Sequence, residues 1–426
     1  MEARHLQGNT AGAAAPRTTG RPRPARADTR RPRRGAPLLL DLALQGGGAH
    51  GAFTWGVLDR LLEHEGIEIA GVSGTSAGAL NAVALAAGLM EGGRDGARQR
   101  LRAVWERVGR LSPFQAAHAD AWGGWTLPWL TDPSSVIPAA WPGLSAWTEP
   151  WRRALVAWGS VWSPYQLNPL NLNPLRTLLA EVVDFDRVRG CHKTRLFIAA
   201  THVRTGNLRI FRQHELTPDV VMASACLPLL FQAVEIDGEP YWDGGYAGNP
   251  SLLPLVEESP AADLLLVQIN PSLRCEHPVR AGDILDRLNE ITFNASLLKE
   301  LRAIALLQAQ ARLLGADPGR GRSARRPPDP RLSAAVPAVD APAALLDRMA
   351  ALRLHRVEGG MALAALGASS KLRTDPAFLG MLHAQGRAAM DRWLAVHGEA
   401  LGRRGTLDPA LAGGLWRAEA AACASG

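Results

Sequence analysis

The sequence of 426 residues is poor in cysteine, lysine and aromatic residues, and it contains no long hydrophobic run. Its four cysteines form no CxxC pair, and its 11 histidines form no cluster at metal-ligand spacing. We therefore expect no disulfide framework, no metal or other cofactor, and a reducing compartment. The longest apolar runs, such as residues 82–90 and 264–269, are far shorter than the roughly 18 residues of a membrane-spanning helix, so the sequence predicts no such helix.

The excess of positive charge is confined to one end of the chain. The formal net charge is +7, and residues 1–36 alone hold nine Arg against Glu2 and Asp28, which also sums to +7. The other residues therefore carry equal numbers of basic and acidic groups, 38 of each. Because this balance gives no basic binding face, we expect no nucleic-acid binding by the folded part.

Two segments lack hydrophobic periodicity and are rich in proline and arginine. Residues 1–36 cannot bury enough apolar surface to offset the entropy of ordering, which predicts a disordered tail. Residues 315–341 form a second such stretch that is too long for an ordinary connection, which indicates a linker or flexible loop. These segments divide the chain into a main domain at 37–314 and a C-terminal helical extension at 342–426.

Short apolar runs alternate with helical patterns along the main domain. The runs that predict β-strands are residues 38–44, 67–72, 195–202, 208–212 and 264–269. The helical patterns are residues 52–64, 77–90, 95–108, 175–183 and 283–314, followed in the extension by 343–357, 376–396 and 409–422. Nearly continuous apolar strands separated by helices predict the α/β class, with a mainly parallel sheet covered on both faces.

A tryptophan-rich segment at about 105–165 interrupts this alternation and has the composition of an insertion. Residues 105–162 hold nine of the 13 tryptophans, interleaved with proline and glycine. Two interpretations stay open, because aromatic side chains bury large areas wherever they lie. The tryptophans either fill an ordinary core or form a lid that faces acyl chains or a membrane interface.

A glycine strip, GGGAHG at residues 46–51, directly follows the first predicted strand. Gly46, Gly47 and Gly48 let backbone N–H groups turn toward one point beside a helix N-terminus, where negative charge is favoured. Such a geometry suits either a dinucleotide pyrophosphate, with Gly51 completing a GxGxxG pattern, or an oxyanion hole. The nucleotide alternative requires an acidic residue at the end of the second strand, whereas Glu68 lies at the start of that strand.

A GxSxG motif made of Gly74, Ser76 and Gly78 lies between the second predicted strand and the helix at 77–90. In that strand–turn–helix context, the two glycines permit a sharp turn that presents the serine hydroxyl as a nucleophile. The structural alternative is that Ser76 merely caps the following helix.

Asp243, Gly244 and Gly245 follow a predicted hairpin at 234–242 that turns at Asp237-Gly238. Alone, Asp-Gly-Gly is more typical of a turn than of a catalytic base. A serine nucleophile nevertheless needs a proton acceptor, and a carboxylate beside two glycines can approach it closely.

In this order, a glycine strip, a GxSxG turn and Asp-Gly-Gly resemble the patatin-like phospholipase family. Two further local matches are ASACLPLLF at 223–231 and Asn249-Pro250, and the resemblance covers roughly residues 38–270. It implies a three-layer α/β/α sandwich and a lipid or acyl-ester substrate of phospholipase or lysophospholipase type.

The resemblance also implies a role for each motif. Ser76 would attack the ester carbonyl, Asp243 would accept the serine proton, and the amides of Gly46 to Gly48 would bind the oxyanion. The supporting glycines of the motifs would be Gly51, Gly74, Gly78, Gly244 and Gly245. His50 departs from the family, which usually carries Arg or Lys there, and we expect it to weaken recognition of an anionic head group.

Other interpretations remain beside the Ser-Asp dyad. An aspartate with an ordinary pKa near 3.9 is a weak base toward an alcohol, so a Ser-His-Asp triad with His202 or His214 competes with the dyad. A non-catalytic alternative is a peripheral lipid-binding protein that uses the arginine tail and the tryptophan segment. We favour a cytoplasmic serine hydrolase with peripheral membrane contact, whose oligomeric state the sequence leaves open.

Overall fold

The computed structural model describes residues 37–111, 163–314 and 342–408 of the chain. The expected tail at 1–36, the expected linker at 315–341 and the helix expected at 409–422 lie outside the described residues. The same holds for residues 112–162 of the tryptophan-rich segment. No helix in the described ranges is both long enough and apolar enough to cross a membrane.

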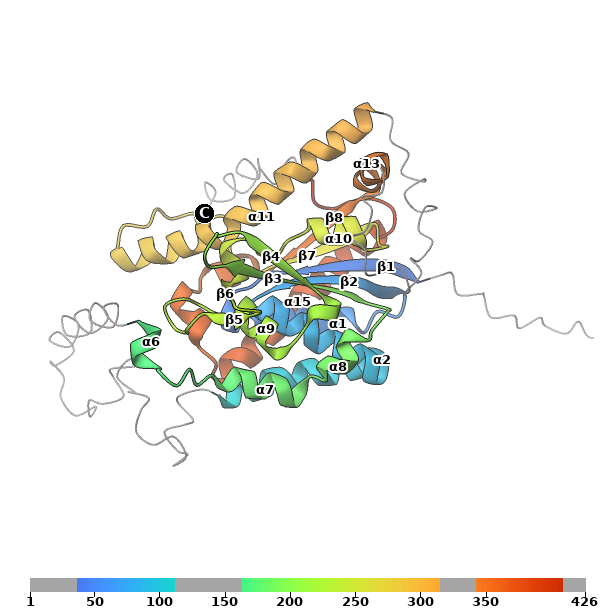
Figure 1. Cartoon of the computed structure of the whole chain (residues 1–426). Helices are drawn as coiled ribbons and strands as arrows, with labels where there is room; N and C mark the ends of the chain where they lie inside the picture. Colours follow the sequence, from blue (N-terminus) through green and yellow to red (C-terminus); the bar gives the residue numbers. More distant parts are fainter. Residues whose placement is uncertain (1–36, 112–162, 315–341, 409–426) are drawn as a thin grey trace, which may run out of the picture. The chain divides into compact units, whose positions relative to one another are not determined.

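Eight strands form one sheet with the order β5-β6-β3-β2-β1-β7-β8, and β4 also pairs with β3 (Figure 1). The strands that run parallel to one another are β1 (Leu38–Leu44), β2 (Ile67–Thr75), β3 (Arg195–His202), β7 (Asp263–Gln268) and β8 (Arg353–Glu358). The antiparallel strands are β4 (Leu208–Arg212), β5 (Val234–Ile236) and β6 (Glu239–Asp243). The mainly parallel sheet predicted from the apolar runs is thereby confirmed.

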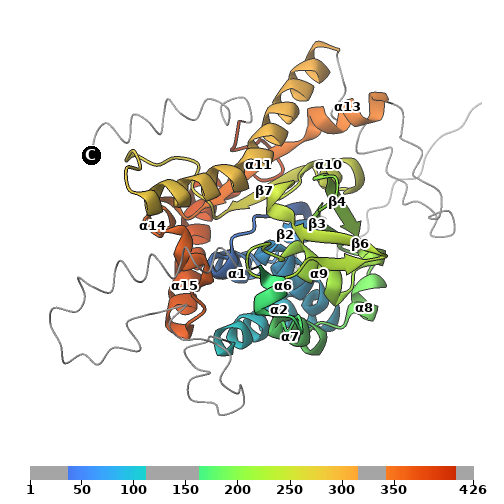
Figure 2. The same ribbon diagram turned by 60° about the vertical axis from the view of Figure 1, so that its left-hand side comes forward.

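Helices cover both faces of the sheet, and each face has its own hydrophobic core (Figures 1 and 2). One face carries α1 (Gly51–Leu61), α2 (Ala77–Arg110), α7 (Pro174–Val182), α8 (Phe185–Arg189), α9 (Pro218–Ser224) and α15 (Pro376–His397). The other carries α10 (Leu253–Glu258), α11 (Ala281–Leu313) and α13 (Pro342–Ala351). This is the α/β/α sandwich that the sequence predicts, with helices in the C-terminal region.

The central strand β1 contains a polar residue, Asp41, that is 2% exposed. A buried carboxylate needs hydrogen-bond donors, and the Ser259 hydroxyl donates to Asp41 Oδ1. The strand register shifts between Leu40 and Asp41 where β1 pairs with β2. The Asp41 side chain is therefore buried in the sheet with a hydrogen-bond donor at Oδ1.

The two helices expected at 77–90 and 95–108 belong to one element, α2, which departs from helical geometry at Gly92 and Gly93. Gly93 has a φ of +61°, a conformation that glycine adopts without strain. After this kink the helix presents Trp105, which is buried and donates from Nε1 to Asn81 Oδ1 at 2.9 Å. This tryptophan, the first of the expected insertion, therefore packs in the core.

The C-terminal region corrects one sequence prediction. The helix expected over residues 343–357 ends at Ala351, and Arg353–Glu358 form β8 at the edge of the sheet. A second correction concerns the cysteines: Cys191 and Cys226 are free and buried, but Cys275 is disulfide-bonded, so the expectation of no disulfide was wrong for this residue. Spacing along the sequence does not show which cysteines folding brings together.

Helix α15 packs directly on α1, and two glycines allow this close approach. A Cβ atom on Gly56 would lie 2.0 Å from the His383 carbonyl oxygen, and one on Gly386 would lie 2.0 Å from the Phe53 carbonyl oxygen. Since no side chain fits at either position, the backbones of the two helices are in contact. The C-terminal helix is thus part of the layer that supports the glycine strip.

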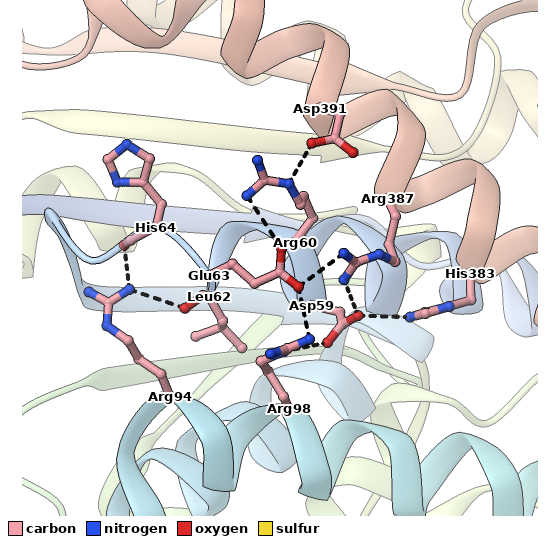
Figure 3. Close-up of polar contacts among 10 residues, drawn as sticks. All are labelled: Asp59, Arg60, Leu62, Glu63, His64, Arg94, Arg98, His383, Arg387 and Asp391. Carbon is pink, nitrogen blue, oxygen red and sulfur yellow. Dashed lines mark hydrogen bonds and ion pairs between the residues drawn. The ribbon is translucent and has the colours of Figure 1, made fainter.

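A charged network joins α1, α2 and α15 around Asp59 (Figure 3). The Asp59 carboxylate accepts hydrogen bonds from Arg98 Nε at 2.7 Å, from His383 Nε2 at 3.2 Å and from Arg387. Burial opposes the charge of Asp59, but these donors outweigh it and hold the pKa of the carboxyl well below its usual range. Glu63 adds a second acceptor for Arg98 and Arg387, so the buried charge is fully paired.

Candidate active site

Ser76 lies at the turn between β2 and α2 and is 7% exposed. Its φ of 54° and ψ of −123° are strained for a residue with a side chain, which is typical of a sharp strand-to-helix turn. Two close approaches require the flanking glycines. A Cβ on Gly74 would lie 2.5 Å from the Gly78 carbonyl oxygen, and one on Gly78 would lie 2.1 Å from that of Leu44.

The sheet register brings the Asp-Gly-Gly turn to the same place. Thr75 pairs with Ala199 across β2 and β3, and the next residue, Ala200, pairs with Asp243 across β3 and β6. A Cβ on Gly244 would lie 2.2 Å from the Ala199 carbonyl oxygen and 3.0 Å from Thr75 Cγ2. The ends of β2 and β6 therefore meet over β3, although the two motifs lie far apart in the sequence.

Asp243 is fully buried, and its backbone is fixed from both sides. Its amide donates to the Cys226 carbonyl oxygen at 2.8 Å, and its carbonyl oxygen accepts from Thr201 Oγ1 at 2.8 Å. Its side chain has fewer partners, because Oδ1 accepts from the Gly245 amide at 2.7 Å while Oδ2 has no hydrogen-bond partner in the described structure. One carboxylate oxygen is thus buried without a donor.

Burial raises the pKa of Asp243 to about 7. The Gly245 amide, the Ser76 hydroxyl and the charge of Lys371 each act in the opposite direction and keep the shift from being larger. The Ser76 side chain is therefore close enough to act on the carboxylate, although Oδ2 completes no hydrogen bond. With a pKa near neutrality, this aspartate is a much better proton acceptor than one with an ordinary pKa.

The glycine strip packs against Ser76. A Cβ on Gly46 would lie 2.7 Å from Ser76 Cβ, so a larger residue there would displace the serine. The Gly46 amide donates to Asn249 Oδ1 at 2.7 Å and is therefore occupied. No hydrogen bond given for the described residues has the Gly47 or Gly48 amide as its donor, unlike the Gly46 amide.

A set of buried side-chain amides holds the strip in place. Asn249 also donates from Nδ2 to the Phe293 carbonyl oxygen at 3.1 Å, and Asn270 Nδ2 donates to the Gly46 carbonyl oxygen at 2.7 Å. Gln45 Oε1 accepts from the Asn270 amide at 2.8 Å. Gln45 and Asn270 follow the ends of β1 and β7, so polar residues at the ends of buried strands were the sequence signal for this network.

The segment matched as ASACLPLLF also contacts the serine turn. Ser224, at the end of α9, is fully buried, and its Oγ accepts from the Ser76 amide at 2.9 Å. In the sequence, this segment stood out only through its resemblance to the family. The structure gives it a physical role, because the bond fixes the backbone of the strained turn.

His50 is 2% exposed and donates from the strip to a distant segment. Its Nε2 lies 2.8 Å from Ser370 Oγ, and Ser370 Oγ itself donates to the Gly367 carbonyl oxygen at 2.6 Å. Nε2 therefore carries the proton of this bond. Burial and the charge of Lys371 lower the pKa of His50 to about 4, so the ring is neutral at pH 7. Nothing in the sequence pattern pointed to residues 367–371 as neighbours of the strip.

The structure gives little geometric support to a Ser-His-Asp triad with His202 or His214, or to nucleotide binding that uses Glu68. Both ring nitrogens of His202 are occupied, by Thr205 Oγ1 and by Glu239 Oε2, each at 2.9 Å, and His214 is exposed. Glu68 is exposed near the start of β2, whereas Ser76 follows the end of that strand. No group of acidic, histidine and cysteine side chains in the described ranges could hold a metal ion.

A cavity of about 580 Å³ has Met222, Cys226 and Phe231 in its wall, whereas neither Ser76 nor Asp243 lines it. Cys226 connects it to the site, since its carbonyl oxygen accepts from the Asp243 amide. Burial and the neighbouring carboxylate raise the pKa of the Cys226 thiol to about 12, so this cysteine is no nucleophile at neutral pH. Leu229, in the same loop, is 86% exposed.

The family model for patatin-like phospholipase matches residues 42–256, more than half of the chain and all three motifs. The comparison with curated proteins finds no match. Among solved structures, VipD from Legionella pneumophila is 13% identical, with a TM-score of 0.39 over 85% of this chain and 67% of VipD. A chain from the complex of full-length SpcU with full-length ExoU of the Pseudomonas aeruginosa type III secretion system is 15% identical, with a TM-score of 0.22 over 91% of this chain and 84% of that one.

Proposed function

The chain belongs to the patatin-like phospholipase family and is a lipid ester hydrolase, and from that premise we propose that Ser76 is its nucleophile and Asp243 its proton acceptor. The observation that carries the proposal is the state of Asp243 beside Ser76. It is fully buried, its Oδ2 lacks a donor among the described residues, and its pKa lies at about 7. A carboxylate in that state can take a proton from an adjacent hydroxyl at neutral pH.

In the proposed first step, Asp243 accepts the Ser76 hydroxyl proton while Ser76 Oγ bonds to the ester carbonyl carbon. The amides of Gly47 and Gly48 donate to the oxyanion, since the Gly46 amide donates to Asn249. The bond to the leaving alcohol then breaks, and Asp243 returns its proton to the alkoxide. In the second step, water gives a proton to Asp243, attacks the acyl-enzyme and releases the acid, after which Asp243 reprotonates Ser76.

The finer assignment is a phospholipase or lysophospholipase that meets lipid surfaces peripherally from the cytoplasm. The family supports a lipid ester as substrate. Exposed leucines in the loop after α9, Leu229 and Leu230, supply apolar surface near the aspartate turn, which suits contact with acyl chains.

The test is covalent labelling of the pure protein with a fluorophosphonate, followed by peptide mass spectrometry, in detergent and on phospholipid vesicles. We expect one adduct, on Ser76, and its loss in Ser76→Ala. In Asp243→Asn the labelling rate should fall by about 10³-fold or more, because the hydroxyl loses its proton acceptor.

His214→Ala is the matched control, since this residue is exposed, and it should label at the wild-type rate. Absence of any adduct under both conditions would contradict the proposal and favour the non-catalytic lipid-binding alternative. An adduct on another serine would contradict the assignment of Ser76.

A further inference from the structure

One cation near the glycine strip has no role in the mechanism above. Lys371 belongs to η6 (Ala368–Leu372), far downstream of the motifs, and it is one of only three lysines in the chain. Its Nζ donates to Asn289 Oδ1 at 2.9 Å and lies 5.5 Å from the centre of the Phe293 ring. In the described part of the chain it forms no ion pair with a carboxylate.

This arrangement leaves the ammonium group incompletely satisfied. An ammonium group has three N–H donors, and Asn289, a neutral partner, occupies one of them. Partial burial beside an aromatic ring removes water, and the nearby carboxylates Glu290, Asp286 and Asp243 act on the ammonium through space without forming an ion pair with it among the described residues. A partly desolvated cation with free donors is a binding site for an anion.

Lys371 also lies directly against the two glycine turns of the site. A Cβ on Gly48 would lie 2.3 Å from the Lys371 carbonyl oxygen, so the backbone of η6 touches the strip. The Phe293 ring beneath the ammonium would lie 2.3 Å from a Cβ on Gly245, next to Asp243. The Lys371 backbone therefore contacts the strip, and its ammonium lies over a ring that packs against the aspartate turn.

His50 does not provide this positive charge. It is buried and neutral at pH 7, and its Nε2 donates to Ser370, the residue before Lys371. The hydrogen bond instead anchors η6 on the strip and so positions Lys371. The prediction that His50 weakens recognition of an anionic head group considers only the local sequence, whereas folding brings Lys371 to the strip from a distant segment.

We propose that Lys371 binds an anionic group of the substrate, the phosphate of a phospholipid or lysophospholipid, beside the ester that reacts at Ser76. The inference rests on the proposed function and adds the substrate class that the site selects. It reverses the expectation that position 50 weakens recognition of an anionic head group, because the charge comes from another segment. Lys371 is then a residue that determines specificity and touches substrate.

Several charged groups face Lys371 and govern its titration. Burial is the largest influence and lowers the pKa of Lys371 to about 8, with Arg274 acting in the same direction. Glu290, Asp286 and Asp243 raise it, and the Glu290 carboxylate is already paired with Arg274 and Arg287. The ammonium is therefore charged at pH 7 and loses its charge above about pH 8.

The experiment compares two substrates that share acyl chain and glycerol, lysophosphatidylglycerol and the corresponding neutral monoacylglycerol, in mixed micelles. We expect Lys371→Gln to lower kcat/KM for the lysophospholipid by about 10- to 100-fold, the effect of losing a charge-assisted hydrogen bond. For the monoacylglycerol we expect a loss of only a few-fold at pH 7, through a higher pKa of Asp243. Lys299→Gln, an exposed lysine on α11, is the matched control and should change neither value.

A second measurement keeps the test independent of the folding of Lys371→Gln. The preference of the wild-type protein for the anionic substrate should fall between pH 7 and pH 9, whereas in Lys371→Arg it should persist, because a guanidinium stays charged. Equal losses on both substrates in Lys371→Gln, or a preference independent of pH in the wild type, would overturn the inference while leaving the hydrolase intact. Hydrolysis of neither substrate, with no Ser76 adduct, would overturn the proposed function and the inference together.

Discussion

Two buried aspartates, Asp59 and Asp243, show how differently one fold treats the same side chain. They are 4% and 0% exposed, respectively. Asp59 has Arg98, Arg387 and His383 around it, and the pKa of its carboxyl is held well below the usual range. Asp243 has one backbone donor and a pKa of about 7. Burial acts on both carboxyls in the same direction, so the supply of donors decides which carboxylate is a fixed structural charge and which can exchange a proton.

The two carboxylates also have opposite effects on the free energy of unfolding. A paired carboxylate whose pKa is lowered adds stability above its unfolded pKa, and that stability is lost as the pH falls. A carboxyl whose pKa is raised does the opposite, because its charged form is disfavoured only in the folded state. Ionised Asp243 therefore lowers the free energy of unfolding at neutral pH. Such a loss of stability is common at active sites.

The largest effect on the free energy of unfolding is expected for Asp243→Asn. The pKa rises from 3.8 in the unfolded chain to about 7 in the folded state, so ionisation favours unfolding progressively between those values and fully above pH 7. Asparagine has no charge to desolvate, and the variant should gain up to about 4 kcal/mol at pH 8 and almost nothing near pH 4. Denaturant unfolding at pH 4, 6 and 8 measures the difference. A gain that does not change with pH would show that the carboxyl is not desolvated as described.

The opposite sign is expected at the other aspartate. Asp59→Asn leaves Arg98 and Arg387 without their buried counter-charge. It should lower the free energy of unfolding by about 3 kcal/mol at pH 7, the lower limit of the loss typical for a broken buried ion pair. The loss is no larger because solvent screens the partly exposed arginines. Its matched control in Figure 3 is Asp391→Asn, whose ion pair with Arg60 is largely exposed and should matter by less than about 1 kcal/mol. Equal losses in the two variants, measured by urea unfolding, would remove the distinction between paired and peripheral charge in this network.

The two motifs of the candidate site differ in how far the sequence could predict them. The serine turn was predictable because its signal is local, with strand, glycines, Ser76 and helix within a dozen residues. Asp243 was predictable only through the order of the motifs, since Asp-Gly-Gly alone is an ordinary turn. The pKa of Asp243 is raised by burial next to β3 and α9, and no local sequence pattern indicates that burial.

Strand β8 and Lys371, both in the C-terminal region, could not be predicted because their roles depend on contacts with residues distant in the sequence. Strand β8 carries Arg353 and His355, polar residues that argue against a buried strand. The structure pairs both with the buried Asp263 of β7, at 2.7 and 3.1 Å, and thereby makes the strand acceptable. Lys371 likewise belongs to no sequence motif. It is of interest only because folding places it beside Gly48 and Phe293.

The smallest effect is expected at the histidine that competes with the dyad. His202 adjoins the aspartate strand, because it pairs with Tyr241 two residues before Asp243, but its ring nitrogens are committed to Thr205 and Glu239. His202→Ala should therefore change kcat/KM for ester hydrolysis by less than about threefold, measured under the conditions used for Ser76→Ala. Removal of a triad histidine would cost about 10⁴-fold or more. A loss of that size in a folded variant would show that the His202 imidazole, and not the Asp243 carboxylate, is the base. Asp243 would then be a structural residue, as Asp59 is.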